Sequence, residues 1–175
     1  MNETERHKIY AGMAEISRKW VSVMDTKAAF LSALNAGTLA LIWIGLKLGE
    51  GRGPSFYLVV LATFFLLISL VVALEVVMPR TNFPQVFGKR LVTNSGSAPI
   101  SFFGYVSSKY PASLANQFVA DVDSMDEKAF AREQLEQHYV ICHVVQTKSN
   151  KVVWSGHFWF VAALLATVSA ILKGY

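Results

Sequence analysis

Residues 80–150 combine basic and aromatic side chains that together could bind a small anion carrying a flat ring. The members of this candidate ligand site are Arg80, Lys89, Arg90, Phe103, Tyr105, Arg132 and Lys148. Guanidinium and ammonium groups pair with phosphate, and aromatic rings offer stacking faces to a base. The same combination is also typical of a surface that is attracted to anionic lipids. Composition leaves both interpretations open.

Other site chemistries have little support in the sequence. Cys142 is the single cysteine, which excludes an intramolecular disulfide and any site built from several cysteines. The four histidines lack the spacing of metal ligands, and neither a phosphate-binding loop nor a GxSxG motif is present. We therefore expect a protein without enzymatic activity, without a metal and without a resident cofactor.

Charged residues are distributed very unevenly along the 175 residues. Three runs carry no charge, namely 28–46, 53–74 and 152–172, with 19, 22 and 21 residues. A helix that crosses a bilayer needs roughly 20 mostly apolar residues, so each run is long enough. The mean hydropathy of +0.39 also disfavours an ordinary soluble enzyme. In a membrane protein, the high pI of about 9.2 reflects topology and does not indicate nucleic-acid binding.

The basic residues lie mainly on one side of the expected spans. Thirteen of the 16 fall before the first run or between the second and the third, and only Lys47, Arg52 and Lys173 fall on the other side. The positive-inside rule then places the N-terminus in the cytoplasm and the C-terminus outside, in a multi-pass membrane protein.

The predicted fold is an all-α membrane protein with a helical cytoplasmic stalk. Its expected segments are an N-terminal amphipathic helix (1–27), a first span (28–47), a second span (55–77), a cytoplasmic sensing region (80–150) and a third span (152–172). Within the sensing region, proline and glycine predict an irregular stretch, and the aromatic residues 100–106 predict a short strand or a pinned loop. A short helix follows over 114–122.

Two heptad-like stripes predict that the stalk helices pack against each other. The first consists of Ile9, Met13, Ile16, Trp20 and Val23, and the second of Ala131, Leu135, Tyr139, Cys142 and Val145. The first stripe would also suit a helix on the membrane surface. A helix capped by Ser124 is expected to continue without a break into the third span, as the first helix does into the first span.

Small residues in the third span suggest a contact between subunits. Ala162, Ala166 and Ala170 recur every four residues, and such spacing lets helices approach closely. We therefore expect a homo-oligomer in the lipid bilayer.

Five charged residues are expected at one depth, where the apolar runs meet the cytoplasm. They are Asp25, Lys27, Glu75, Lys148 and Lys151. Charges at this depth are costly unless they pair or reach the surface. The hypothesis is that Lys27 pairs with Glu75; the alternative is that all five mark the interface.

Several short motifs, in order along the chain, resemble the Pycsar effector family of bacterial membrane proteins. Asp25-Thr26-Lys27-Ala28-Ala29 resembles the start of that family's first span, and Pro79-Arg80 resembles the pair that closes its second. Phe103-Gly104 resembles its aromatic element, and the helix that ends in Lys148 resembles its last third. The resemblance covers roughly residues 10–172.

The resemblance implies an antiphage effector. It would respond to a cyclic pyrimidine mononucleotide, cyclic CMP or cyclic UMP, made by a partner nucleotide cyclase. It would then impair the inner membrane and cause abortive infection. Alternatives are a membrane scaffold that recruits a soluble partner without forming a pore, and a small channel subunit.

Overall fold

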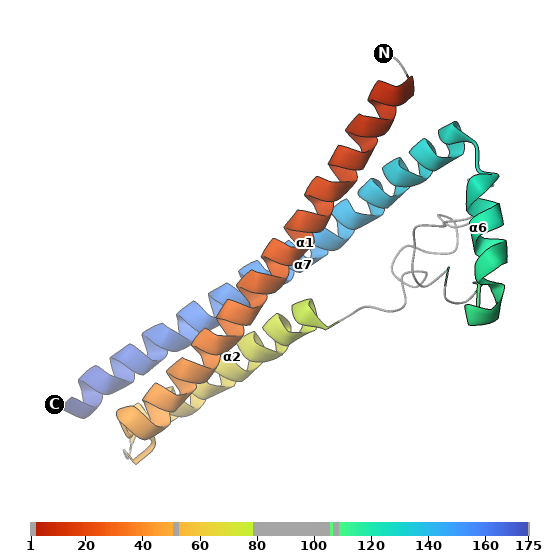
Figure 1. Ribbon diagram of the computed structural model, residues 1–175. Coiled ribbons are helices and arrows are strands. Elements are labelled where there is room, and N and C mark those ends of the chain that lie inside the picture. The colour runs from red at the N-terminus through yellow and green to blue at the C-terminus, as the bar shows by residue number, and fades with distance from the viewer. Residues whose placement is uncertain (1–2, 51–52, 79–105, 107–108, 175) are drawn as a thin grey trace. The chain divides into compact units, whose positions relative to one another are not determined.

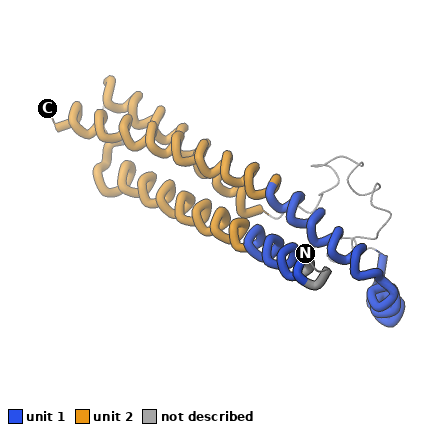
Figure 2. The backbone as a smooth tube through the Cα atoms, turned by 90° about the horizontal axis from the view of Figure 1, so that it is seen from above, with its two compact units in different colours: residues 1–18, 79–142 blue, residues 19–78, 143–175 orange. Residues whose placement is uncertain are grey.

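The computed structural model describes residues 3–50, 53–78, 106 and 109–174. The chain divides into two compact units, which Figure 2 colours separately. Unit one comprises residues 1–18 and 79–142, and unit two comprises residues 19–78 and 143–175.

Three long helices dominate the described residues (Figure 1): α1 (Glu3–Ala40), α2 (Pro54–Val77) and α7 (Glu127–Gly174). Shorter elements are the π-helix η1 (Leu41–Gly45), the 3₁₀ turns η2 (Leu48–Glu50) and η3 (Ala112–Leu114), and helix α6 (Ala115–Asp123). Helices α1 and α7 run without a break from one unit into the other, as the sequence predicted. No strand occurs among the described residues.

All three long helices contain a segment long and apolar enough to cross a bilayer. The protein is therefore a multi-pass membrane protein. The helical class predicted from the charge-free runs is confirmed. Helices suit this environment, since in hydrocarbon a helix satisfies its backbone hydrogen bonds within one segment.

Local residue types explain where α2 begins and ends. Pro54 occupies the first turn, where its missing N–H costs no hydrogen bond. Gly53 precedes it with φ of 82°, a conformation that glycine adopts without strain. At the other end, the backbone N–H of Met78 donates to the carbonyl of Leu74, and Pro79 cannot continue the helix.

Small side chains form much of the core of unit two. Val59, Ala62 and Ala162 have no exposed surface, and Leu66 and Ile42 are almost fully buried beside them. Small residues allow helix backbones to approach closely, which is how helices associate in lipid.

The predicted role of Ala162 and Ala166 in a contact between subunits is therefore wrong. Both are buried, 0% and 9% exposed, within the core of unit two in a single chain. Ala170 is partly buried and packs against the same core. The i, i+4 spacing correctly identified a close helix contact but could not specify whether the partner helix belonged to the same chain.

The first predicted stripe is not the buried face of α1. In unit one, Ala14 and Ser17 are buried, whereas Ile9 and Ile16 are exposed. In unit two the same shift occurs: Met24 and Ala28 are buried. Trp20 and Val23 are exposed. The larger apolar residues of α1 therefore lie beside its buried face, because close packing between helices favours small side chains at the contact.

The second stripe is likewise largely exposed. Leu135 is 40% and Tyr139 53% exposed, and Cys142 is exposed, while the polar Glu133 is buried. The prediction that α1 and α7 meet along the large apolar residues is therefore wrong for these positions.

In the region before α7, the predicted short helix is present, but the predicted capping role of Ser124 is wrong. Helix α6, preceded by η3, matches the predicted helix over 114–122. Ser124 does not cap the start of α7: it is the C-cap of α6, and its hydroxyl donates to the carbonyl of Asp121 at 2.9 Å. The predicted irregular stretch lies outside the described residues, as does the predicted short strand apart from Val106.

Ala162→Leu tests the close packing of unit two. The larger side chain has no space at a fully buried position, and overpacking costs typically 1–3 kcal/mol. We expect a lower thermal midpoint for the purified protein in detergent. Val161→Leu is the matched control, because Val161 is 38% exposed on the same helix and should leave the midpoint unchanged. Equal midpoints for the two variants would contradict the packing.

Candidate functional site

Two ion pairs join the three helices of unit two at one end of their apolar segments. Lys148 of α7 donates to Asp25 of α1, and Lys151, one helical turn later, donates to Glu75 of α2. The two lysines are three positions apart on α7, so they project from nearby positions and engage different neighbours. The pairs tie α7 to both other helices where the charges would otherwise face the edge of the hydrocarbon.

The pairing differs from the one hypothesised from the sequence. Glu75 pairs with Lys151 and not with Lys27. Among the residues that the structure describes, Lys27 makes no ion pair and no hydrogen bond. The charged layer, defined as Asp25, Lys27, Glu75, Lys148 and Lys151, therefore contains two ion pairs and a lysine outside them.

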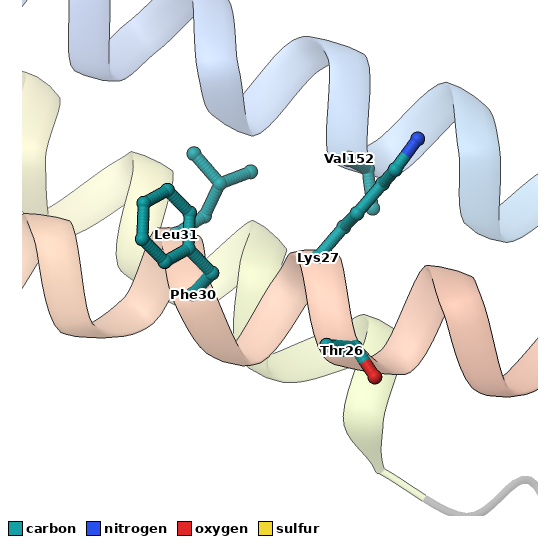
Figure 3. Close-up of a pocket in the computed structure, with 5 residues that line it drawn as sticks. All are labelled: Thr26, Lys27, Phe30, Leu31 and Val152. Atoms are coloured by element: carbon teal, nitrogen blue, oxygen red, sulfur yellow. The ribbon is translucent and has the colours of Figure 1, made fainter.

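A shallow groove lies beside Lys27. Its lining residues are Thr26, Lys27, Phe30 and Leu31 of α1 and Val152 of α7. Figure 3 shows the Lys27 side chain extending toward Val152, with its nitrogen turned away from Phe30 and Leu31. The groove is thus apolar along most of its length and carries a cation at one end.

A buried polar cluster joins the same three helices farther into the apolar segments. Ser69 of α2 and Ser155 of α7 donate reciprocally to each other's backbone carbonyls, at 2.8 and 2.9 Å. Asn35 of α1 donates through Nδ2 to the Ser69 hydroxyl at 2.9 Å. All three side chains are at most 1% exposed. Such contacts replace the water that the hydrocarbon lacks and hold the helices close.

One atom of this cluster has no partner among the residues that the structure describes. The Asn35 side-chain oxygen is buried without a hydrogen bond, although the amide nitrogen donates twice, to Ser69 and to the carbonyl of Leu31. A buried acceptor that loses water without gaining a partner is unfavourable by about 1–3 kcal/mol. The closed packing of these helices therefore includes an unfavourable group at its centre.

Further polar contacts close the opposite end of unit two. Lys173 donates to the backbone carbonyls of Leu46 and Lys47, at 3.3 and 2.6 Å, and so satisfies acceptors after η1. Ser169 donates to the carbonyl of Ser55 at 2.9 Å. Between the ends, the Trp159 indole donates to the Thr38 hydroxyl at 3.0 Å.

Unit one brings a serine, a histidine and the cysteine together. The Ser17 hydroxyl lies 2.5 Å from His138 Nδ1 and 3.9 Å from the Cys142 sulfur. Ser17 also donates to the carbonyl of Met13. The described residues contain no group of three or more histidine, cysteine or acidic side chains that could hold a metal.

A second cluster of unit one connects Tyr110 with α6. The Tyr110 hydroxyl donates to Asp121 Oδ2 at 2.5 Å, and Lys109 lies 3.5 Å from the same oxygen. The hydrogen bond to the Asp121 carboxylate raises the pKa of Tyr110 above its usual range, and the same bond lowers the pKa of Asp121. The Tyr110 ring packs edge-on against Phe118.

The predicted ligand residues are only partly described. Arg80, Lys89, Arg90, Phe103 and Tyr105 lie outside the described residues, as do the motif positions Pro79 and Gly104. The structure describes two members of the predicted site. Arg132 of unit one pairs with Glu136 at 3.0 Å. Lys148 of unit two pairs with Asp25. The predicted site thus stays a prediction.

The buried cluster was not among the predicted site residues. A signal for it was available, because Asn35, Ser69 and Ser155 are polar residues within charge-free runs. Polar side chains at such positions are usually turned toward other helices. Which of them meet depends on the rotation of three helices, which the sequence pattern does not specify.

A double-mutant cycle tests the pairing within the charged layer. Lys151→Met and Glu75→Gln should each lower the free energy of unfolding, and the double variant should lose less than the sum, with a coupling of about 0.5–1 kcal/mol. Lys27→Met with Glu75→Gln is the matched control and should be additive. The measurement is helix loss on titration with a denaturing detergent. Coupling in the control cycle with additivity in the other would contradict the observed pairing.

A tyrosine titration tests the Tyr110 hydrogen bond. The ultraviolet difference between the protein and Tyr110→Phe isolates the absorbance of the Tyr110 phenol. This phenol should titrate above the usual tyrosine pKa, and Asp121→Asn should lower the Tyr110 pKa. Because the Tyr110 pKa is raised and that of Asp121 lowered, the bond stabilises unit one between about pH 4 and pH 10. This contribution is lost as the pH rises through the Tyr110 pKa or falls through the Asp121 pKa. An unchanged Tyr110 titration in Asp121→Asn would contradict the contact.

Comparison with known proteins assigns the chain to a family. The family model described as the Pycsar effector protein domain matches residues 11–173, which leaves out only the first ten residues and the last two. No curated protein and no solved structure matches the chain. The match includes the charged layer, the buried polar cluster, all of α2 and most of α1 and α7. The chain therefore belongs to the Pycsar effector family, and this membership supports a role as an effector of antiphage defence.

Proposed function

We propose that this protein responds to a cyclic-nucleotide signal, such as cyclic CMP or cyclic UMP, and then impairs the integrity of the inner membrane. The observation that carries the proposal is the family match over nearly the whole chain, from residue 11 to residue 173. In this proposal the protein performs no catalysis, a nucleotide cyclase supplies the signal, and several copies act together.

The packing of unit two supports a change of state as the damaging event. In the described structure its core is filled by side chains such as Val59, Ala62 and Ala162, which have no exposed surface. Among the described residues, these side chains fill the space between the three helices of unit two. Membrane damage would require the helices to separate or several copies to assemble into another arrangement.

The buried polar cluster is the part of unit two most suited to such a change. Asn35, Ser69 and Ser155 contribute hydroxyl and amide groups at the centre of the closed state, and the Asn35 oxygen has no partner there. Separation of the helices would let water reach these groups and relieve the unpaired acceptor. A signal that favours the separated state shifts the population only by its differential affinity for the two states.

Helix continuity offers a route for the signal. Both α1 and α7 extend from unit one into unit two as single helices. A ligand that changed the packing of either helix in unit one could therefore reorient the part of that helix that crosses the bilayer. The basic and aromatic residues of the predicted ligand site would provide the binding groups, with the N-terminus and this site in the cytoplasm.

A reversible cross-link tests the proposal. In a Cys142→Ala background, Ser69→Cys and Ser155→Cys place two thiols at the position where the hydroxyl oxygens lie 3.0 Å apart. Reconstituted in liposomes, the reduced protein should release an encapsulated dye when cyclic CMP or cyclic UMP is added. Oxidation should join α2 to α7 and abolish the release, and a reductant should restore it. Gel mobility of a proteolytic digest reports the cross-link.

The single-cysteine variants Ser69→Cys and Ser155→Cys, oxidised in the same way, are the matched controls and should keep the response. Failure of every cyclic mononucleotide to release dye or collapse the membrane potential would contradict the nucleotide response. Release that persists after complete cross-linking would contradict separation of α2 from α7. A stable soluble partner together with an intact membrane potential would favour a scaffold.

A further inference from the structure

The ion pairs of the charged layer leave Lys27 in a distinct position. Asp25 is engaged by Lys148 and Glu75 by Lys151, so both acidic side chains of this layer already have a lysine partner. Lys27 is exposed and makes no hydrogen bond or ion pair with any described residue. An ammonium group at the edge of the hydrocarbon needs a counter-charge or water, and among the described residues the two acidic side chains of this layer are paired with other lysines.

The surroundings of Lys27 combine this cation with the apolar walls of the shallow groove. The groove has a volume of about 440 Å³, and its lining includes Phe30 and Leu31 of α1 and Val152 of α7 in addition to the lysine. These three residues belong to the charge-free runs that cross the bilayer, whereas Lys27 immediately precedes the first run. In Figure 3 the lysine nitrogen points away from Phe30 and Leu31, so the charged end of the groove is separate from these two residues, whereas Val152 lies beside the lysine side chain.

We propose that this groove binds an anionic phospholipid. The phosphate group would pair with the Lys27 ammonium, and one acyl chain would lie along Phe30, Leu31 and Val152. A phospholipid is the ligand that offers negative charge and a hydrocarbon chain in this order at this depth. A free phosphate or a soluble headgroup would match the lysine alone and leave the apolar walls uncovered.

Within the groove, Lys27 carries the recognition of the headgroup. The other polar lining residue, Thr26, already donates its hydroxyl proton to the backbone carbonyl of Ser22 at 3.0 Å, so it is not a donor to the phosphate. Anionic lipid preference should therefore depend on one side chain. The apolar walls should affect retention of any phospholipid, whatever its charge.

Lipid retention measured on the full-length protein tests the proposal. The protein is released from detergent into a mass spectrometer after equilibration with phosphatidylglycerol or phosphatidylcholine of identical acyl chains. We expect a preference for phosphatidylglycerol that falls about fivefold in Lys27→Met, the change expected for loss of one lysine near an anionic surface. Lys27→Arg should keep the preference.

Two further variants separate the site from general effects of charge and stability. Lys47→Met, which removes an exposed lysine at the other end of the first span, should leave the preference unchanged. Val152→Trp should fill the groove and lower retention of both lipids. Thermal midpoints of Lys27→Met and Lys27→Arg are compared, so that unfolding is not mistaken for lost binding.

Several outcomes would overturn the proposal. These are an unchanged preference in a folded Lys27→Met, an equal loss in Lys47→Met, and unchanged retention in Val152→Trp. Displacement of phosphatidylglycerol by inorganic phosphate alone would show that the lysine binds a free anion without the acyl chain. None of these results depends on nucleotide-induced membrane damage, so the lipid site and the proposed function fail independently.

Discussion

The contact between Ser69 of α2 and Ser155 of α7 is the interaction on which the packing of unit two depends. Each hydroxyl donates to the other residue's backbone carbonyl, which requires the two helices to approach closely. In lipid, an apolar side chain gains little by exchanging lipid tails for another helix, because both surroundings are apolar. Close packing and hydrogen bonds must therefore hold the helices together. Small residues such as Ala62 and Ala162 fill the contact, and the larger apolar residues are left for the outside.

This constraint also explains the arrangement of charge. Helix α7 contacts both α1 and α2, so it supplies the two lysines that pair with Asp25 and Glu75. At the opposite end it supplies Lys173 for the backbone carbonyls after η1. Polar contacts at both ends and in the middle therefore depend on one helix. A change in its packing would affect all three levels at once, as the proposed separation of the bundle requires.

Prediction from the sequence succeeded where a single helix decides the outcome. The three charge-free runs lie in three helices that can cross a bilayer, and both polar helices continue into them. Prediction failed where the contact made by a residue depends on how a neighbouring helix is oriented. Depth along the chain predicts a pair between Lys27 and Glu75, but the structure places Lys151 of α7 against Glu75. The spacing of Ala162 and Ala166 predicts a contact with a partner subunit, whereas both residues pack within the chain.

The sequence by itself determined the number of spans, the helical class and the family, because these depend on the length of apolar runs and on short motifs in order. Only the tertiary structure decided which faces are buried. Ala14 and Ser17 are buried while Ile9 and Ile16 are exposed, a choice that hydrophobicity alone predicts the wrong way round. The physical reason is that helices in contact select side chains for size and hydrogen bonding, and neither follows from hydropathy.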